Sequence, residues 1–201
     1  YWDPDRGIPR MYTYSLRIER QFANHWMTGL AYVGNRGTQN TGRTENPAVY
    51  IPGASTVGNT QQRRVYPNFG SISRSETTAN TTYDSLQWNL EKRFSHGFSI
   101  LTNYVWSKTL VTNWSQDPFD LVTRETGLSD DDVPHNFKFS NVWEIPRAPV
   151  TGAADKILNG WQLNAIVVWQ SGFPFGITAG PDNALRGGTD RANFVGGGSA
   201  Q

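Results

Sequence analysis

Alternation of apolar and polar residues is the feature that most limits how this chain can fold. In the segment MYTYSLRIERQF (residues 11–22), the even positions from Tyr12 to Phe22 are apolar, apart from Arg20. The odd positions are polar, apart from Met11. Because neighbouring side chains of a strand point to opposite faces, this period of two indicates a β-strand with one apolar and one polar face.

The same pattern recurs in five later segments, two of which alternate less cleanly. They are WMTGLAYVG (26–34), DSLQWNLEKRF (84–94), FSILTNYVWSKTL (98–110), HNFKFSNVWEI (135–145) and WQLNAIVVWQ (161–170). The apolar residues do not recur at the third and fourth positions that a helix requires. We therefore expect an all-β, antiparallel, strongly curved up-and-down meander with about six long strands of roughly 9–12 residues each.

The connections between these segments differ in length. Short turns at residues 23–25 and 95–97 contrast with a polar tract at 35–82 and an acidic stretch at about 111–132. Part of the polar tract, GSISRSETT (70–78), is expected to form a rim hairpin and not a membrane crossing, because both of its faces are mostly polar. Short turns on one side and long loops on the other are typical of outer-membrane barrels.

Strand length and aromatic residues also favour part of a large transmembrane β-barrel. About 9–11 tilted residues cross a bilayer, whereas soluble strands average about 5–6 residues. Phe22 and Trp26 flank one short turn, and Phe94 and Phe98 flank the other, as expected for an interfacial aromatic belt. The alternative fold is a soluble β-sandwich binding module, whose half-exposed strands alternate in the same way.

The polar face of residues 84–94 is expected to line a water-filled lumen. The lumen-facing candidates are Ser85, Gln87, Asn89, Glu91 and Arg93. On the apolar face, Lys92 and Lys108 lie near strand ends, from which we expect them to reach lipid headgroups. Six strands would leave open edges in hydrocarbon, so further strands are expected to complete the barrel.

Charge and composition exclude several other classes of function. The net charge of +1 gives no field that would attract nucleic acid. Cysteine is absent, which excludes disulfide and thiolate chemistry. The three histidines match no zinc spacing, and no nucleophile elbow is present. We therefore predict no enzyme activity, no catalytic or cofactor-binding residues and no nucleic-acid partner.

The long loops supply candidate ligand contacts. Arg63 and Arg64 are candidates for contact with an anionic ligand or with outer-leaflet lipopolysaccharide, and a solvated loop is the alternative. Trp114 and Phe119 are candidates for stacking on a sugar or peptide, and packing within their own loop is the alternative.

The acidic loop offers oxygen ligands. Asp117 and Asp120 are candidate ligand contacts, and Glu125 and residues 130–132 add further carboxylates that could hold Ca²⁺. Their spacing matches no EF-hand, so we interpret them as solvated loop charge and predict no metal site.

The segment YDSLQWNLEKRFSHGFSILTNYVWSKTL (83–110) resembles the barrel of TonB-dependent outer-membrane receptors, specifically the Oar-like group. In that group a Y-x-S-L-x-x-x-x-E-K-R-F-S-x-G strand and turn precede a Y-x-W-S-K strand. Other pieces agree in the same order, so the resemblance covers nearly the whole chain. They are AYVGNRGT (31–38), NPA (46–48), GLSDDDVPHNFKFSNVWEIP (127–146) and LNGWQLNAIVVWQSGFPFGIT (158–178).

This resemblance implies a Gram-negative outer-membrane barrel of about 22 strands with a plugged lumen, which takes up scarce solutes with energy passed through TonB. Residues 1–201 would then be part of the barrel domain. The plug, the TonB-contacting segment, the signal peptide and the C-terminal strand are expected elsewhere in the parent chain. The expected partners are outer-membrane lipid, the remaining strands, the plug and TonB. A passive porin or a surface adhesin is the alternative, and siderophore, oligosaccharide, peptide and protein ligands all stay open.

Overall fold

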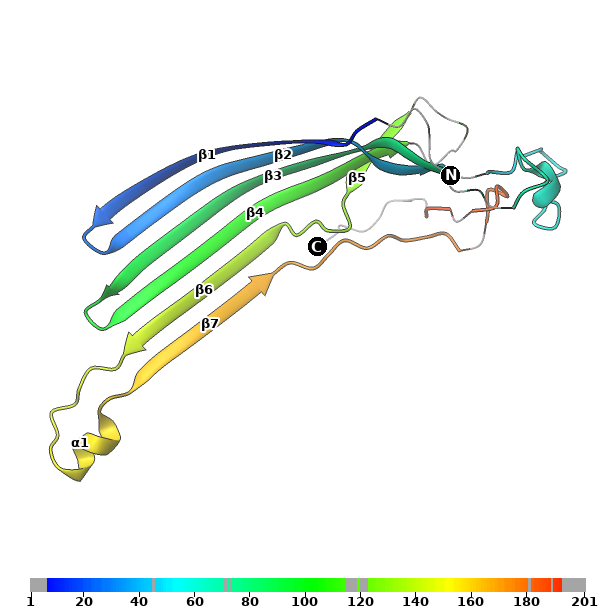
Figure 1. The fold of residues 1–201 in the computed structure, drawn as a ribbon. Coiled ribbons are helices and arrows are strands. Elements are labelled where there is room, and N and C mark those ends of the chain that lie inside the picture. Colours follow the sequence, from blue (N-terminus) through cyan, green and yellow to red (C-terminus); the bar gives the residue numbers. More distant parts are fainter. Residues whose placement is uncertain are drawn as a thin grey trace, which may run out of the picture.

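The computed structural model describes residues 7–44, 46–70, 72, 74–114, 119, 123–180, 182–188 and 190–192. In this part of the chain, one antiparallel sheet has the strand order β1-β2-β3-β4-β6-β7, and β5 pairs with β4. The strands are β1 (Arg10–Ala23), β2 (Trp26–Thr44), β3 (Arg74–Ser95), β4 (Phe98–Trp114), β5 (Arg124–Leu128), β6 (His135–Glu144) and β7 (Gln162–Gln170). The sheet is a single curved layer (Figure 1), which confirms the predicted all-β meander.

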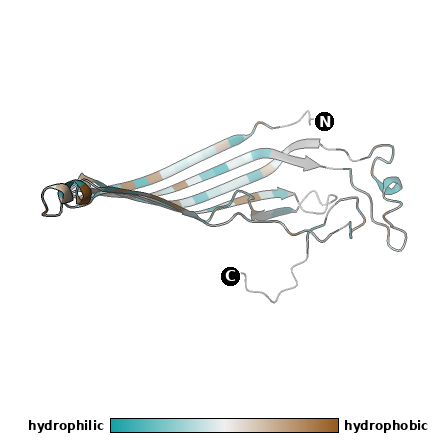
Figure 2. Cartoon of the chain, turned by 90° about the horizontal axis from the view of Figure 1, so that it is seen from below, coloured by the Kyte–Doolittle hydropathy of each residue, from teal (hydrophilic) through white to brown (hydrophobic). Residues whose placement is uncertain are grey.

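The strand register gathers the apolar positions on one face. Leu30 lies opposite Trp88, and Trp88 lies opposite Tyr104. Tyr104 in turn faces Phe137, which faces Trp169. This row crosses five strands without leaving the apolar face, and hydrophobic and hydrophilic positions alternate along the strands in Figure 2.

The sheet has almost no core of its own. Among the described residues, the buried apolar side chains are those of Ala31, Ala48 and Ala79. Large apolar side chains stay open, with Leu16 69% and Trp106 57% exposed. A continuous apolar surface of this kind is unfavourable in water. A β-sandwich would cover it with a second sheet, and the described residues form only one.

Three strands are longer than the sequence predicted. β2 has 19 residues, β3 has 22 and β4 has 17, whereas about 9–11 suffice to cross a bilayer. Residues 35–44, expected to be a loop, continue β2. Residues 74–82 continue β3, and the two extensions pair as far as Thr44 opposite Arg74. The expected rim hairpin is therefore the outer end of the β2–β3 pair and not a separate element.

β5 is a seventh strand, which lies within the stretch expected to be the acidic loop. β4 pairs with β6 from Phe98 to Trp106, and with β5 from Leu110 to Trp114. Between the two partners, the amide of Thr109 donates to the carboxylate of Asp132 at 2.5 Å. Asp132 is 1% exposed, so its side chain replaces a missing strand neighbour where β4 changes partner.

The connection between β6 and β7 contains a helix that the sequence did not predict. It is α1 (Ala153–Leu158), a six-residue helix. It lies at the same end of the sheet as the two short turns (Figure 1). Its N-cap, Gly152, makes no side-chain capping bond, so the usual start signal is missing. No helix in the described residues is long and apolar enough to span a membrane.

The β3–β4 turn consists of two residues with positive φ. His96 has φ 52° and Gly97 has φ 81°, a backbone that fits the twist of a tight hairpin and that glycine adopts at little cost. Lys92 holds this turn closed. Its ammonium donates to the Ser95 carbonyl and to the Phe98 carbonyl, each at 2.8 Å, and it lies 3.6 Å from the centre of the Phe98 ring.

Lys92 therefore does not reach outward as expected. Its side chain is nearly buried, with the residue 4% exposed, and a third bond from its ammonium goes to Ser95 Oγ at 3.0 Å. An ammonium has three N–H donors, so Lys92 satisfies all of them within its own hairpin.

Replacing Lys92 with methionine should destabilise this end of the sheet. The two carbonyls would lose a charged donor where little water reaches them, so the free energy of unfolding should fall by about 1–3 kcal/mol. Urea unfolding of the protein in phospholipid bilayers measures this change. Lys138→Met is the matched control, because Lys138 is exposed on the polar face, and should change stability by less than about 0.5 kcal/mol. Equal stability of the two variants would contradict the role given to Lys92.

Candidate functional site

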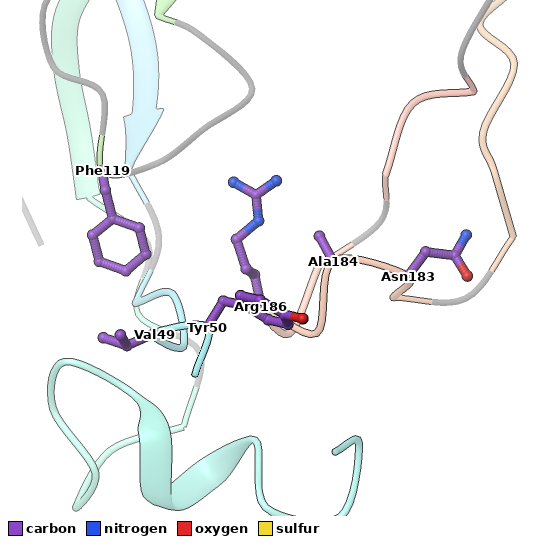
Figure 3. Close-up of a pocket in the computed structure, with 6 residues that line it drawn as sticks. All are labelled: Val49, Tyr50, Phe119, Asn183, Ala184 and Arg186. Atoms are coloured by element: carbon purple, nitrogen blue, oxygen red, sulfur yellow. The ribbon is translucent and has the colours of Figure 1, made fainter. Parts of the chain in front are cut away.

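Three loop segments that are far apart in the sequence meet beyond the outer ends of the strands. They are residues 46–70 between β2 and β3, Phe119 between β4 and β5, and residues 182–188 after β7. Together they enclose a pocket of about 500 Å³. It is lined by Val49, Tyr50, Phe119, Asn183, Ala184 and Arg186 (Figure 3). We call it the rim pocket.

Arg63 joins two of these segments. The residue is 8% exposed, and its guanidinium donates to the Val49 carbonyl at 2.5 Å, the Thr56 carbonyl at 3.1 Å and the Leu185 carbonyl at 2.9 Å. Arginine presents several donors in a fixed planar fork. It can therefore bind carbonyls from both loops at once, and one of these carbonyls belongs to Val49, which lines the rim pocket.

The segment after β7 is shaped by aspartate side chains that accept backbone N–H groups. Asp182 accepts the amide of Arg186 at 2.7 Å and that of Gly187 at 2.6 Å. Asp190 accepts the amide of Ala184 at 2.7 Å. Such bonds fix a loop that has no strand partner. This wall of the rim pocket is therefore held by hydrogen bonds within its own loop.

The rim pocket has the chemistry of a binding site. Tyr50 is 54% exposed and Phe119 is 46% exposed, so each ring offers a face for stacking. The amide nitrogen of Asn183 is held by the Ala179 carbonyl at 2.8 Å, which fixes the direction of its amide oxygen. Figure 3 shows Arg186 between Phe119 on one side and Asn183 on the other. Aromatic faces with a few fixed polar groups are typical of small-ligand sites.

The structure places the predicted loop residues in different positions. Arg63 is buried and bonded to the Val49 and Leu185 carbonyls, and Arg64 donates through Nη1 to the Asn46 carbonyl within the same loop. Trp114 ends β4, and its side chain lies outside the described part. Asp117 and Asp120 also lie outside the described residues. Their contacts with a ligand stay predictions, and so do those of the two arginines.

Of the candidates from the sequence, Phe119 lines the rim pocket itself. Sequence reasoning missed Tyr50, Asn183 and Arg186, because each stands in a polar loop without a recognisable motif. Nothing in the sequence signals that residues 46–70 and 182–188 meet. In the described part of the chain, no three His, Asp or Glu side chains gather as metal ligands would.

The lumen-facing candidates share the polar face of β3. Asn89 accepts a hydrogen bond from Arg17 at 3.1 Å, across two strands. Glu91 pairs with Arg93 at 3.3 Å. The side chain of Gln87 donates to Ser85 Oγ at 3.2 Å. The five residues therefore belong to a hydrogen-bonded polar surface opposite the apolar face, and their exposure to a lumen stays a prediction.

The comparison with protein families matches this geometry. Residues 1–201 match the family model described as an outer membrane beta barrel domain. The chain belongs to this family. A search of curated proteins and a search of solved structures gave no significant match.

As an outer membrane beta barrel domain, the chain lies in the outer membrane, and its apolar face contacts lipid. Aromatic side chains mark both boundaries of this face. Near the short turns, the rings of Phe22 and Trp26 stack with centroids 6.1 Å apart. Toward the long loops, Tyr104 and His135 stack at 6.1 Å, and the Tyr104 hydroxyl hydrogen-bonds His135 Nδ1 at 2.7 Å. Aromatic belts at these two levels are typical of such barrels.

Loss of Arg63 should loosen the rim pocket without unfolding the sheet. In Arg63→Ala, three carbonyls lose a charged donor, so amide exchange in residues 46–70 and 182–188 should accelerate by at least about tenfold. Hydrogen–deuterium exchange of the membrane-embedded protein measures this change. Arg147→Ala, an exposed arginine at the opposite end of the sheet, is the control and should leave exchange at the rim unchanged. Unaltered rim exchange in Arg63→Ala would show that other contacts hold the two loops.

Two neighbouring residues of β7 test which face meets lipid. Val167 lies on the apolar face opposite Phe139, and Ile166 lies on the other face opposite Ser140. Val167→Arg should lower the free energy of unfolding by about 2–4 kcal/mol, because the charge enters hydrocarbon. Ile166→Arg should change it by less than about 1 kcal/mol. Urea unfolding in bilayers compares the two, and a larger loss in Ile166→Arg would reverse the assignment of the faces.

Proposed function

We propose that this chain forms part of a TonB-dependent outer-membrane receptor, similar to the Oar-like group, which captures a ligand at the rim pocket and passes it inward. One observation carries this proposal. Long loops from three places in the chain converge into one ordered pocket at one end of the sheet, and the opposite end carries two tight turns and a short helix-containing connection (Figure 1).

The order of the rim supports capture over passive flow. The buried guanidinium of Arg63 and the carboxylates of Asp182 and Asp190 hold the loops by side-chain bonds to the backbone. A preformed site binds with a smaller loss of conformational entropy. A passive pore has no need of such a site above its wall.

The chemistry of the rim pocket favours a ring-bearing solute such as a sugar or a peptide. Tyr50 and Phe119 offer stacking faces, and Asn183 offers an oriented amide oxygen. None of the six lining residues forms a nucleophile and base pair. We therefore propose binding and passage, without catalysis.

The remaining parts of the receptor are proposed to come from the parent protein. In the described residues, β1 pairs only with β2, and β7 pairs only with β6. Each therefore has a free edge, which hydrocarbon does not tolerate. Further strands would close the barrel, and a plug would cover the polar face that carries Arg17, Asn89 and Glu91. TonB would act on the parent protein through a segment that precedes the barrel.

The full-length parent protein, purified from outer membranes, tests this proposal with two probes. It should bind the purified periplasmic domain of TonB. Planar bilayers that contain it should show no steady KCl conductance, because a plug fills the lumen.

The alternatives give different results. A passive porin would conduct at once and would not bind the TonB domain. A surface adhesin would neither bind that domain nor release a solute inward. Absence of TonB binding by the folded full-length protein would overturn the proposal.

A further inference from the structure

The helix α1, in the connection between β6 and β7, is amphipathic in spite of its short length. Its apolar residues are spaced so that they share one side of the helix. They are Ala153, Ala154, Ile157 and Leu158. Asp155 and Asn159 are four positions apart and lie on the opposite side. The helix therefore has an apolar side and a polar side.

The polar side of α1 faces the protein, and the apolar side faces outward. The side chain of Asn159 accepts the amide of Ala148 at 2.6 Å, and it donates to the Ala148 carbonyl at 3.1 Å and to Asp155 at 2.7 Å. These bonds fix the orientation of the helix. Ile157 is 66% exposed and Leu158 is 53% exposed. A helix on the surface of a water-soluble protein has the reverse arrangement, with its apolar side against the core.

Trp161 connects the apolar side of α1 to the lipid-facing face of the sheet. It lies six positions before Val167, so the two side chains share a face. The ladder still reaches Trp161, because its carbonyl accepts the amide of Ile145 at 2.9 Å. Its indole Nε1 donates to the Ile157 carbonyl at 2.7 Å. The last turn of α1 therefore lies on the same side of the sheet as the face that contacts lipid.

The level of Trp161 corresponds to the headgroups of the periplasmic leaflet. Phe98, beside a short turn, faces Trp143, and Trp143 faces Leu163, so these residues lie at the inner boundary of the apolar face. Trp161 is two positions farther out, which at about 3.4 Å per residue and about 40° of tilt is a distance of about 5 Å. The headgroup region extends about 5–7 Å beyond the hydrocarbon on each side.

We propose that α1 is an interfacial helix, which lies in the periplasmic leaflet of the outer membrane with Ile157 and Leu158 among the acyl chains. Such a helix buries its apolar side about 5–10 Å into the boundary between headgroups and acyl chains. Lipid is the occupant that fits this surface, because Trp161 makes it continuous with the face already in lipid. The periplasmic connections of outer-membrane barrels are otherwise short turns, so α1 would be an additional anchor beside the free edge of β7. This inference uses the membrane location of the family and does not depend on TonB or on uptake.

Spin labels in the full-length parent protein, reconstituted into phospholipid bilayers, test this position. Residues 1–201 contain no cysteine, so Ile157→Cys and Leu158→Cys each give one labelling site once any cysteine outside these residues is replaced. Both labels should be accessible to oxygen, protected from a water-soluble nickel chelate, and about 5–10 Å below the headgroup level. Lys156→Cys is the control, because Lys156 is exposed and lies outside the apolar side of the helix. Its label should be accessible to the nickel chelate.

Two outcomes would overturn the proposal. Equal access of the nickel chelate to positions 156, 157 and 158 would place α1 in the periplasm. Protection of positions 157 and 158 from both oxygen and nickel would show that protein covers the helix, whether from the plug, a second copy of the chain or a periplasmic partner. Either result would leave TonB binding and the conductance of the full-length protein as they are, so this inference and the receptor proposal fail separately.

Discussion

Backbone hydrogen bonding in a medium without water is the constraint on which the rest of this structure depends. Each N–H and C=O group that lies in hydrocarbon needs a partner within the protein, and the described strands meet this need by pairing in one continuous antiparallel ladder. The ladder fixes which residues of neighbouring strands lie opposite each other, and this register decides which side chains share a face of the sheet. The row from Leu30 to Trp169 therefore stays on the lipid-facing side. The free edges of β1 and β7 are the places where the same constraint demands further strands.

The sheet and the rim are stabilised in different ways. Among the described apolar side chains of the sheet, only alanines are buried, so its stability comes mainly from the ladder and from lipid that covers its apolar face. The described rim loops have no extended ladder. A few backbone hydrogen bonds hold them, such as the one from the Ala48 amide to the Arg186 carbonyl at 2.9 Å. Side chains bound to backbone groups add to these, above all the guanidinium of Arg63. Asp132 works on the same principle where β4 changes partner. The rim and the membrane wall can therefore change independently.

The sequence predicted β1 almost to the residue, because Tyr12 to Phe22 alternate cleanly. It predicted the turn at His96 and Gly97, where glycine allows positive φ. It failed at the outer ends of β2 and β3, because both faces of these segments carry mostly polar residues and the sequence there resembles a loop. The helix α1 was missed because it is short and has no side-chain cap. Phe119 was named as a candidate, but its neighbours Tyr50 and Arg186 were not.

The sequence by itself determined which residues share a face of the sheet, because side chains alternate along a strand whatever the partner strands are. It also determined that the connections differ in length. Only the tertiary structure decided which loops meet. It also decided which lysine ammonium is enclosed by hydrogen bonds and which is exposed. Lys92 and Lys108 look alike in the sequence, yet Lys92 is enclosed by its hairpin and Lys108 stands open above Trp106. The meeting of the loops depends on contacts between residues far apart in the chain. The bonds of Lys92 to Ser95 and Phe98 depend on the closed geometry of its hairpin, which the alternation of side chains does not record.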